Sequence, residues 1–345
     1  MITGRPIHLM EICGTHTVSI ARSGLKQFLP PDVKLISGPG CPVCVTPPEA
    51  IDQIVSLSLE PNVTVCTYGD MLRVPGSRPE TSLLKAKAKG ARVEMVFSPM
   101  DAVRIAETEP DRKIVFIGVG FETTAPGTLA AVKAAVEKDL PNFSVYLLLK
   151  RTPPAVRALL RDPGAQIDGF LCPGHVAVII GEAGFSFLPE EYRLPAVISG
   201  FEPADIWLSL KELERQVRKN DPRLVNTYFR VVKPEGNVLA LRLIEEMTEP
   251  ADAFWRGLGK IEGSGFALKS AYQRFDASLR YSLPLPESSA PTACRCGDIL
   301  CGKLEPEGCP FFGGACTPER PLGPCMVSSE GSCAAAYAYR DWQDE

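Results

Sequence analysis

Short apolar runs with strand character recur through the N-terminal two thirds of the chain. A turn rich in Gly or Pro and then a helical pattern follow each of them. This alternation is typical of βα units, which build a parallel sheet with helices on its faces. The sequence therefore predicts an α/β fold with mostly parallel sheets. The expected strands cover residues 8–13, 33–37, 63–67, 93–97, 113–118, 144–149, 169–171 and 196–198.

These units form two similar halves. Residues 10–17 and residues 117–124 both contain a strand end followed by a short polar turn that ends in Thr. We therefore predict two similar α/β domains, residues 1–107 and 108–225, whose strand-end turns face a central cleft. Ligands of open α/β sheets bind outside the carboxyl ends of the strands, so this cleft is the predicted site.

The pattern changes after about residue 226. Residues 227–232 and 237–243 predict a β-hairpin, and residues 282–291 are rich in Pro and Ser, as expected of a linker. A Cys-rich tail follows and ends in a helix-like run over residues 334–342. We expect residues 226–345 to form a third, Cys-rich domain.

The bulk properties exclude some classes of function. The chain has 345 residues and a formal net charge of −4 without a basic run, which argues against a nucleic-acid surface. No apolar run reaches the length of a membrane span, and the first residues lack a signal-peptide pattern. The predicted location is therefore the cytoplasm. In that compartment, many cysteines indicate metal or redox chemistry more than a disulfide framework.

Seven of the twelve cysteines lie in the tail. They are Cys294, Cys296, Cys301, Cys309, Cys316, Cys325 and Cys333. Such a segment has few apolar residues, so a bound metal would supply the missing folding energy. Zinc sites usually contain closely spaced Cys pairs, whereas well-separated thiolates suit an iron–sulfur cluster with four Cys ligands. Structural zinc and paired disulfides are the alternatives.

Cys41 and Cys44 form a C-x-x-C motif after a predicted strand, where we expect a helix to start. A helix N-terminus and a neighbouring thiol both lower a thiol pKa. The pair is therefore predicted to alternate between dithiol and disulfide. The alternative is half of a zinc site.

Other strand-end turns carry further reactive side chains: Cys13, His16, Glu122 and His175. If the turns share a cleft, these residues meet Cys41 and Cys44 there. Sulfur ligands combined with imidazole favour late or low-valent metals, including iron with π-acceptor ligands. The ordinary alternatives are buried packing for Cys13 and a helix N-cap role for Glu122. Cys66 and Cys172 are predicted to be core residues.

This set of motifs resembles the hydrogenase maturation factors of the HypD family over nearly the whole chain. The matching segments are residues 13–16, 38–44, 69–76, 120–124 and 173–176, together with the tail. The family's C-x14-C-x6-C-x16-C pattern matches four tail cysteines, Cys294, Cys309, Cys316 and Cys333, as ligands of a [4Fe–4S] cluster. The resemblance leaves Cys296 and Cys325 for an accessory disulfide, and Cys301 without a role.

The resemblance also implies a function. HypD-like proteins act with the small chaperone HypC as a scaffold for the Fe(CN)2CO group of [NiFe]-hydrogenases. Transient iron would lie between Cys13 and a HypC cysteine. HypE would deliver cyanide, which derives from carbamoyl phosphate through HypF. Cys41 and Cys44 would relay electrons from the cluster, and His16, Glu122 and His175 would line the cleft.

Two other classes of function compete with this interpretation. One is a free-standing thiol–disulfide oxidoreductase with an iron–sulfur cluster, and the other is a zinc-stabilised binding module without chemistry. The relay hypothesis rests on electron counting. Release of cyanide from a thiocyanate requires two electrons, which a dithiol stores, whereas a cluster transfers them one at a time.

Overall fold

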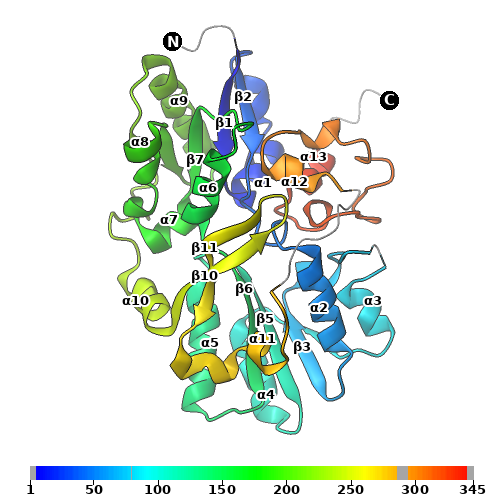
Figure 1. Ribbon diagram of the computed structural model, residues 1–345. Helices are drawn as coiled ribbons and strands as arrows, with labels where there is room; N and C mark the ends of the chain where they lie inside the picture. Colours follow the sequence, from blue (N-terminus) through cyan, green and yellow to red (C-terminus); the bar gives the residue numbers. More distant parts are fainter. Residues whose placement is uncertain (1–4, 79, 286–293, 340–345) are drawn as a thin grey trace.

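The computed structural model describes residues 5–78, 80–285 and 294–339. Two parallel sheets, one of five strands and one of four, form its core, and an antiparallel hairpin lies between them (Figure 1). The Cys-rich tail packs beside the first sheet, where α13 lies against α1. The fold is therefore α/β with mostly parallel sheets, as predicted.

The first sheet has the strand order β2-β1-β7-β8-β9, and all of its pairs are parallel. Leu9 and Leu35 point to one side of this sheet, where they pack with Leu213 of α9. Its strands are β1 (Ile7–Glu11), β2 (Val33–Ser37), β7 (Gly169–Pro173), β8 (Ala196–Ser199) and β9 (Leu224–Asn226). The helices that follow these strands are α1 (Gly14–Arg22), α7 (Gly174–Ile180), α8 (Phe187–Tyr192) and α9 (Pro203–Lys219).

The second sheet has the order β4-β3-β5-β6 and is also entirely parallel. Phe116 and Phe143 are fully buried in it and pack against Leu129 of α5. Its strands are β3 (Val63–Thr67), β4 (Val93–Met95), β5 (Lys113–Gly120) and β6 (Phe143–Leu149). Its helices are α2 (Pro48–Ser58), α3 (Leu83–Ala88), α4 (Pro99–Thr108) and α5 (Ala125–Glu137). Helix α6 (Thr152–Leu160) follows β6 in the chain but contacts β11.

Every strand expected in the first 200 residues is present, but the strands do not follow the predicted division at residue 107. The first two strands, β1 and β2, pair with β7 and β8, whereas β3 and β4 pair with β5 and β6. Backbone hydrogen bonds from Ile12 N to Leu171 O and from Asp168 N to His8 O join β1 to β7. Both sheets are therefore built from discontinuous segments. Local sequence defines a strand, but not the distant strand with which it pairs.

The hairpin predicted at residues 227–243 is wrong. Residues 238–247 form helix α10 (Val238–Met247), whose N-cap Asn237 accepts a hydrogen bond from Ala240 N. The hairpin lies next in the chain, as β10 (Thr248–Trp255) and β11 (Gly259–Leu268). The apolar residues of this short segment follow helical spacing, which resembles strand alternation over a few residues. Only the first part of the predicted linker, to residue 285, falls within the described residues.

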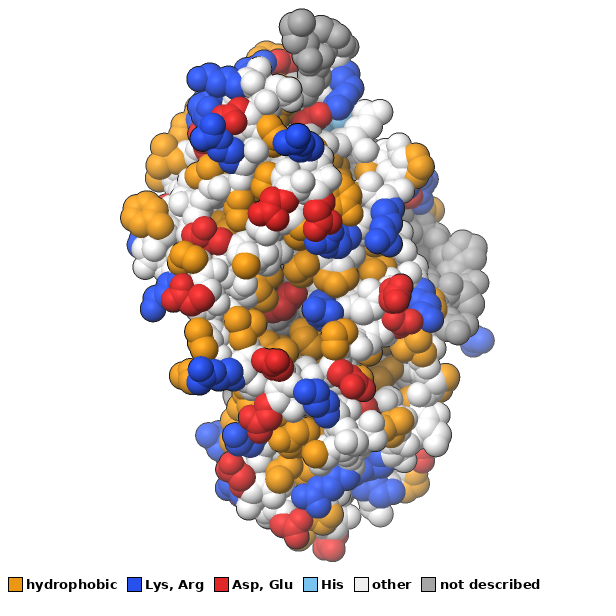
Figure 2. All heavy atoms as spheres, turned by 60° about the vertical axis from the view of Figure 1, so that its left-hand side comes forward, with side chains coloured by type: hydrophobic (Ala, Val, Ile, Leu, Met, Phe, Trp, Pro, Cys, Tyr) orange, Lys and Arg blue, Asp and Glu red, His pale blue; other side chains and the backbone are white. Residues whose placement is uncertain are grey.

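The rest of the chain consists of short helices. The helix-like run in the tail is α13 (Ser332–Tyr339), which confirms that prediction as far as residue 339. The other short α-helices are α11 (Ala277–Arg280) and α12 (Cys296–Leu300). Within residues 5–78, 80–285 and 294–339, no helix is both long and apolar enough to cross a membrane. On the face in Figure 2, acidic and basic side chains are interspersed.

The discontinuous sheets give a first prediction. A fragment of residues 1–107 should lack cooperative unfolding, because β1 would lose β7 and the apolar residues of both sheets would be exposed. Circular dichroism during thermal unfolding measures this. Co-expression with residues 108–345 is the control, and it should restore a cooperative transition by supplying β5 and β7. Cooperative unfolding of the isolated fragment would contradict the interleaved arrangement.

Candidate functional site

The turn after β1 holds Cys13 against the loop that follows β2. Cys13 is 8% exposed and is the N-cap residue of α1. Gly14 N donates a hydrogen bond of 3.1 Å to Gly40 O. A Cβ atom on Gly40 would lie 2.1 Å from Cys13 N, so only glycine permits this approach. The Cys13 turn and the Cys41–Cys44 loop therefore form one packed unit.

Two carboxyl groups, those of Glu11 and Glu330, act on Cys13. Glu11, 2% exposed, accepts hydrogen bonds from Cys13 N at 3.1 Å and from the Thr17 hydroxyl. Burial raises the pKa of Glu11 to about 7. Burial also raises the pKa of Cys13 to about 12, and the charges of Glu330 and Glu11 add to this rise. The Cys13 thiol therefore keeps its proton at neutral pH until a cation replaces it.

Two histidines meet at the same edge of the first sheet. The rings of His16 and His175 both stack on Phe201, with ring centroids 4.8 Å and 3.8 Å away. His16 Nε2 lies 2.9 Å from Gly200 O, and burial lowers the pKa of His16 to about 4. The carbonyl can only accept, so Nε2 carries the proton and Nδ1 keeps a free lone pair. Among the described residues, Nδ1 has no hydrogen-bond partner.

His175 differs from His16 in its exposure. It lies on the surface at the start of α7, and burial on one side lowers its pKa while the charge of Glu330 opposes this. The same carboxylate acts on Cys13 and accepts a hydrogen bond of 2.8 Å from the Thr15 hydroxyl. Through Glu330, the Cys-rich tail therefore contacts the Cys13 turn.

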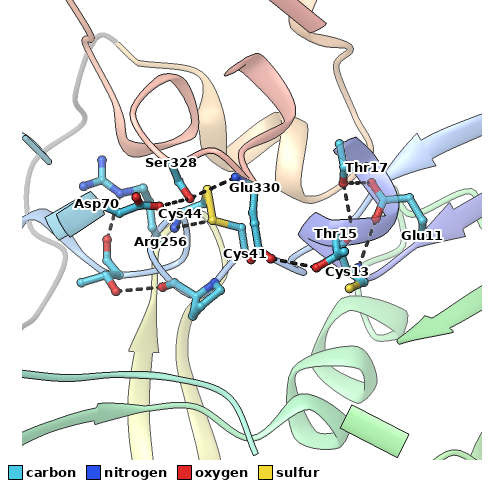
Figure 3. Close-up of a disulfide and its surroundings, with 12 residues drawn as sticks. Glu11, Cys13, Thr15, Thr17, Cys41, Cys44, Asp70, Arg256, Ser328 and Glu330 are labelled. Atoms are coloured by element: carbon cyan, nitrogen blue, oxygen red, sulfur yellow. Dashed lines mark hydrogen bonds between the residues drawn. A yellow bond between two sulfur atoms is a disulfide. The ribbon is translucent and has the colours of Figure 1, made fainter. Parts of the chain in front are cut away.

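Cys41 and Cys44 are joined by a disulfide, with exposures of 3% and 0%. Figure 3 shows this disulfide between the Cys13 turn and a second contact of the tail, where Ser328 donates a hydrogen bond of 2.9 Å to Asp70. The structure thus confirms that the two cysteines are neighbours. The helix start predicted here is wrong, because residues 42–45 form a turn and α2 begins at Pro48.

Glu122 occupies a different environment. It follows β5 in the second sheet, and its carboxylate accepts hydrogen bonds from Thr152 N at 2.7 Å and Thr152 Oγ1 at 2.8 Å. Burial raises its pKa, and these hydrogen bonds oppose the rise. Glu122 therefore caps the N-terminus of α6, which begins at Thr152, and not the helix that follows it in the chain. The structure joins Cys13, His16, His175 and the disulfide through shared contacts, whereas the hydrogen bonds of Glu122 go to Thr152.

Five tail cysteines line one small, mostly apolar pocket. Four of them, Cys294, Cys309, Cys316 and Cys333, are the predicted cluster ligands, and the fifth is Cys296. The rest of the lining is Arg295, Ile299, Phe311, Phe312, Leu322 and Met326. Burial, and then the neighbouring tail thiols, raise the pKa of Cys333. Within the described residues, no three His, Cys, Asp or Glu side chains are arranged to hold a single metal ion. Four thiols around an apolar pocket fit a multinuclear cluster, whose ligands lie further apart than those of one ion.

The remaining cysteines are all buried and unbonded. Cys296 and Cys325 are hydrogen-bonding neighbours without a disulfide. The Cys301 thiol donates to Gly257 O at 3.7 Å. Cys66 and Cys172 are fully buried core residues, as predicted.

Sequence reasoning missed several residues of the site. Phe201 lies in a strand-end turn that the pattern had identified, so its position carried a signal. Glu330 had no comparable signal, because the tail was considered only for its thiols. Arg256 and Lys150 also went unnoticed, since neither belongs to a motif.

Lys150, at the carboxyl end of β6, is a buried amine. It is 3% exposed, and its Nζ donates to Phe254 O at 2.9 Å and lies 5.9 Å from the Trp255 ring centroid. Burial lowers the pKa of Lys150 to about 7. This lysine therefore connects the second sheet to β10 and loses its charge near neutral pH.

An α/β protein with a buried thiol site and a Cys-rich tail is a candidate for metal or redox chemistry, and comparison with known proteins specifies the family. The family model "HypD: Hydrogenase formation hypA family" matches residues 1–340. "Hydrogenase maturation factor HypD2" of Bradyrhizobium diazoefficiens is 46% identical over 99% of this chain and 91% of its own length. "Hydrogenase maturation factor HypD" of Escherichia coli is 45% identical, with coverages of 99% and 91%. The chain belongs to the HypD family.

The low pKa of Lys150 gives a prediction about stability. Because folding lowers this pKa, the unfolded chain binds more protons above about pH 7, so the native protein gains stability as pH rises. Relative to Lys150→Met, the wild type should gain about 3 kcal/mol in free energy of unfolding between pH 6 and pH 9. Urea denaturation at several pH values measures this. The variant also leaves Phe254 O unpaired, but that cost is constant with pH. A pH-independent difference would contradict a buried, neutralised lysine.

Proposed function

We propose that this protein is a hydrogenase maturation factor: a scaffold and redox catalyst that, with HypC, assembles the Fe(CN)2CO group of [NiFe]-hydrogenases. It accepts cyanide from HypE. The names of relatives that match along nearly their whole lengths support the hydrogenase role. The observation that carries the proposal is the contact between the Cys13 turn and the disulfide loop, made by Gly14 N and Gly40 O. A thiol for iron and a pair that stores two electrons lie in one buried unit.

Iron is the substrate of this site, and Cys13 is its proposed ligand. Since the pKa of Cys13 is about 12, iron must displace the thiol proton at neutral pH. His175 is exposed and close to the Glu330 carboxylate, so its imidazole accepts that proton. The Nδ1 lone pair of His16 is buried and has no partner among the described residues, so it is free to accept a further hydrogen bond.

The Cys41–Cys44 pair drives the release of cyanide. In the reaction, its dithiol form becomes the disulfide and gives up two electrons and two protons. The thiocyanate carbon–sulfur bond breaks, yielding a thiol on HypE and hydrogen cyanide, which binds iron after losing its proton. The disulfide must then be reduced for another cycle.

The tail is the proposed source of these electrons. Cys294, Cys309, Cys316 and Cys333 would hold a [4Fe–4S] cluster, which supplies one electron at a time when bound. The tail also contacts the Cys13 turn, which packs on the disulfide loop, through Glu330, and it contacts the turn after β3 through Ser328 and Asp70. This arrangement favours a relay that runs from the tail to the loop.

The oxidoreductase alternative requires access to the disulfide. The burial of Cys41 and Cys44 argues against attack on protein-sized substrates. Turnover of generic disulfides without HypC would support that alternative.

The overall test is anaerobic co-purification with HypC after expression with all accessory factors. Infrared spectroscopy of the complex should show CN and CO stretches. Their absence would count against the scaffold function.

The relay predicts the effect of Cys41→Ser. This variant cannot form the disulfide, so cyanide transfer to iron should fall at least tenfold, as judged by growth of the CN bands in the complex with HypC. Cys66→Ala is the matched control, because Cys66 is buried in β3 with no assigned role. Transfer at the wild-type rate in Cys41→Ser would exclude the relay.

The cluster predicts unequal roles for the tail cysteines. Cys333→Ala should lower the iron and acid-labile sulfide content of anaerobically purified protein, because one of four ligands is lost. Cys301→Ala, which removes another buried tail thiol, should retain both. A colourless wild-type preparation with stoichiometric zinc would contradict the cluster assignment.

A further inference from the structure

Arg256 lies in the turn of the β10–β11 hairpin and is fastened to the disulfide loop. Its backbone N donates to Val45 O at 2.8 Å, and its Nε donates to Thr46 O at 3.0 Å. These carbonyls belong to the two residues after Cys44. Arg256 is 6% exposed, so its charge is held in a largely water-free environment against the loop that carries the disulfide. Figure 3 shows Arg256 on the Cys44 side of the disulfide, away from Cys13.

The hairpin turn also presses against the tail. Gly257 has a φ of +83°, and a Cβ atom there would lie 2.4 Å from Cα of Gly297 in α12. The Cys301 thiol donates to Gly257 O on the same turn. On the other side, the Trp255 indole donates to Ser264 Oγ at 2.8 Å, which holds the two strands together. The residues that flank Arg256 are therefore fixed from both sides.

The charge of Arg256 acts on the tail thiols as well. Hydrogen bonding to Cys296 and then burial raise the pKa of Cys294, and the positive charge of Arg256 opposes that rise. The same charge reaches Cys296 and Cys325. A single buried cation thus lies between the disulfide loop and the tail.

One end of this guanidinium has no partner. Within the described part of the chain, Arg256 Nη2 is buried and makes no hydrogen bond. A buried donor without an acceptor is costly and rare, and charged donors cost the most. The cost of the unpaired Arg256 Nη2 donor is offset if an anion forms near it in another redox state of the protein. Reduction of the neighbouring disulfide creates that anion, because it forms a thiolate.

We propose that Arg256 is a positioning residue whose guanidinium stabilises the thiolate formed when the Cys41–Cys44 disulfide is reduced. The disulfide takes up two electrons and one proton, its S–S bond breaks, and one thiolate and one thiol result. Arginine keeps its charge at every pH at which the protein is folded, so it favours the reduced state throughout. Arg256 thereby makes the disulfide a better electron acceptor for the tail. This last step rests on the proposed function, whereas the effect on the disulfide does not.

The test measures the reduction equilibrium of the disulfide in the full chain. Anaerobic protein is equilibrated with mixtures of dithiothreitol and its oxidised form, so that a dithiol supplies both electrons, and the free thiols of Cys41 and Cys44 are counted by alkylation and mass spectrometry. In Arg256→Met, the equilibrium constant for reduction should fall about tenfold. This corresponds to a potential about 30 mV more negative.

Two further variants separate charge from structure. Arg256→Lys keeps the charge and should recover most of the lost equilibrium constant. Arg151→Met is the matched control, because Arg151 donates to Gly263 O of the same hairpin at 2.7 Å, and it should leave the constant unchanged. If Arg256→Met fails to unfold cooperatively, Arg256→Lys is compared with Arg256→Gln instead.

If Arg256→Met, which removes the charge, keeps the wild-type equilibrium constant for disulfide reduction, the proposal is wrong. Equal losses in the lysine and neutral variants would also overturn it, because charge would then be irrelevant. The dithiothreitol equilibrium needs neither HypC nor iron, so this test can succeed or fail independently of the proposed function. If the constant falls while cyanide transfer keeps its rate, Arg256 retains its role and the relay is wrong.

Discussion

The parallel pairing of β1 with β7 is the constraint on which the site depends. It aligns Glu11 with Leu171, so the turns that follow the two strands emerge at the same edge of the first sheet. These turns carry Cys13 and His175. Pairing of β7 with β8 adds the turn that contains Phe201, on which both histidine rings stack. Three segments distant in the sequence therefore meet because main-chain hydrogen bonds align their strands.

The β10–β11 hairpin and the Cys-rich tail then connect this edge of the first sheet to the disulfide loop and the second sheet. The tail contacts the Cys13 turn through Glu330 and the second sheet through Ser328 and Asp70. The β10–β11 hairpin contacts the disulfide loop through Arg256 and the end of β6 through Lys150. The hairpin contacts bury the charged groups of Arg256 and Lys150, which is costly unless hydrogen bonds satisfy them. The hairpin and the tail also touch each other at Gly257 and Gly297. This arrangement explains how a cysteine-rich tail far along the chain can act on thiols near its start.

Burial controls the acid–base chemistry of this region. It keeps Cys13 protonated and His16 neutral, and it raises the pKa of Glu11 into the neutral range. A water-exposed thiol in the same motif would ionise more readily and would be open to oxidation. Burial therefore protects the Cys13 thiol by keeping it protonated at neutral pH. In the proposed function, binding of iron would offset the loss of this proton.

The sequence by itself determined the strands, the class of fold and the chemistry of the motifs. Apolar runs bounded by Gly and Pro report local backbone preferences, and the thiol and imidazole groups keep their chemistry wherever they lie. The four tail cysteines that the family resemblance selects all line one pocket, which Cys296 also lines. Tertiary structure decided which strands pair and which side chains contact each other. It placed β1 beside β7, directed the hydrogen bonds of Glu122 to Thr152, and brought Phe201, Arg256 and Glu330 to the thiols. The strand pairing and the contacts of Arg256 and Glu330 join segments more than 150 residues apart, as with Ile12 and Leu171, and no local pattern encodes them.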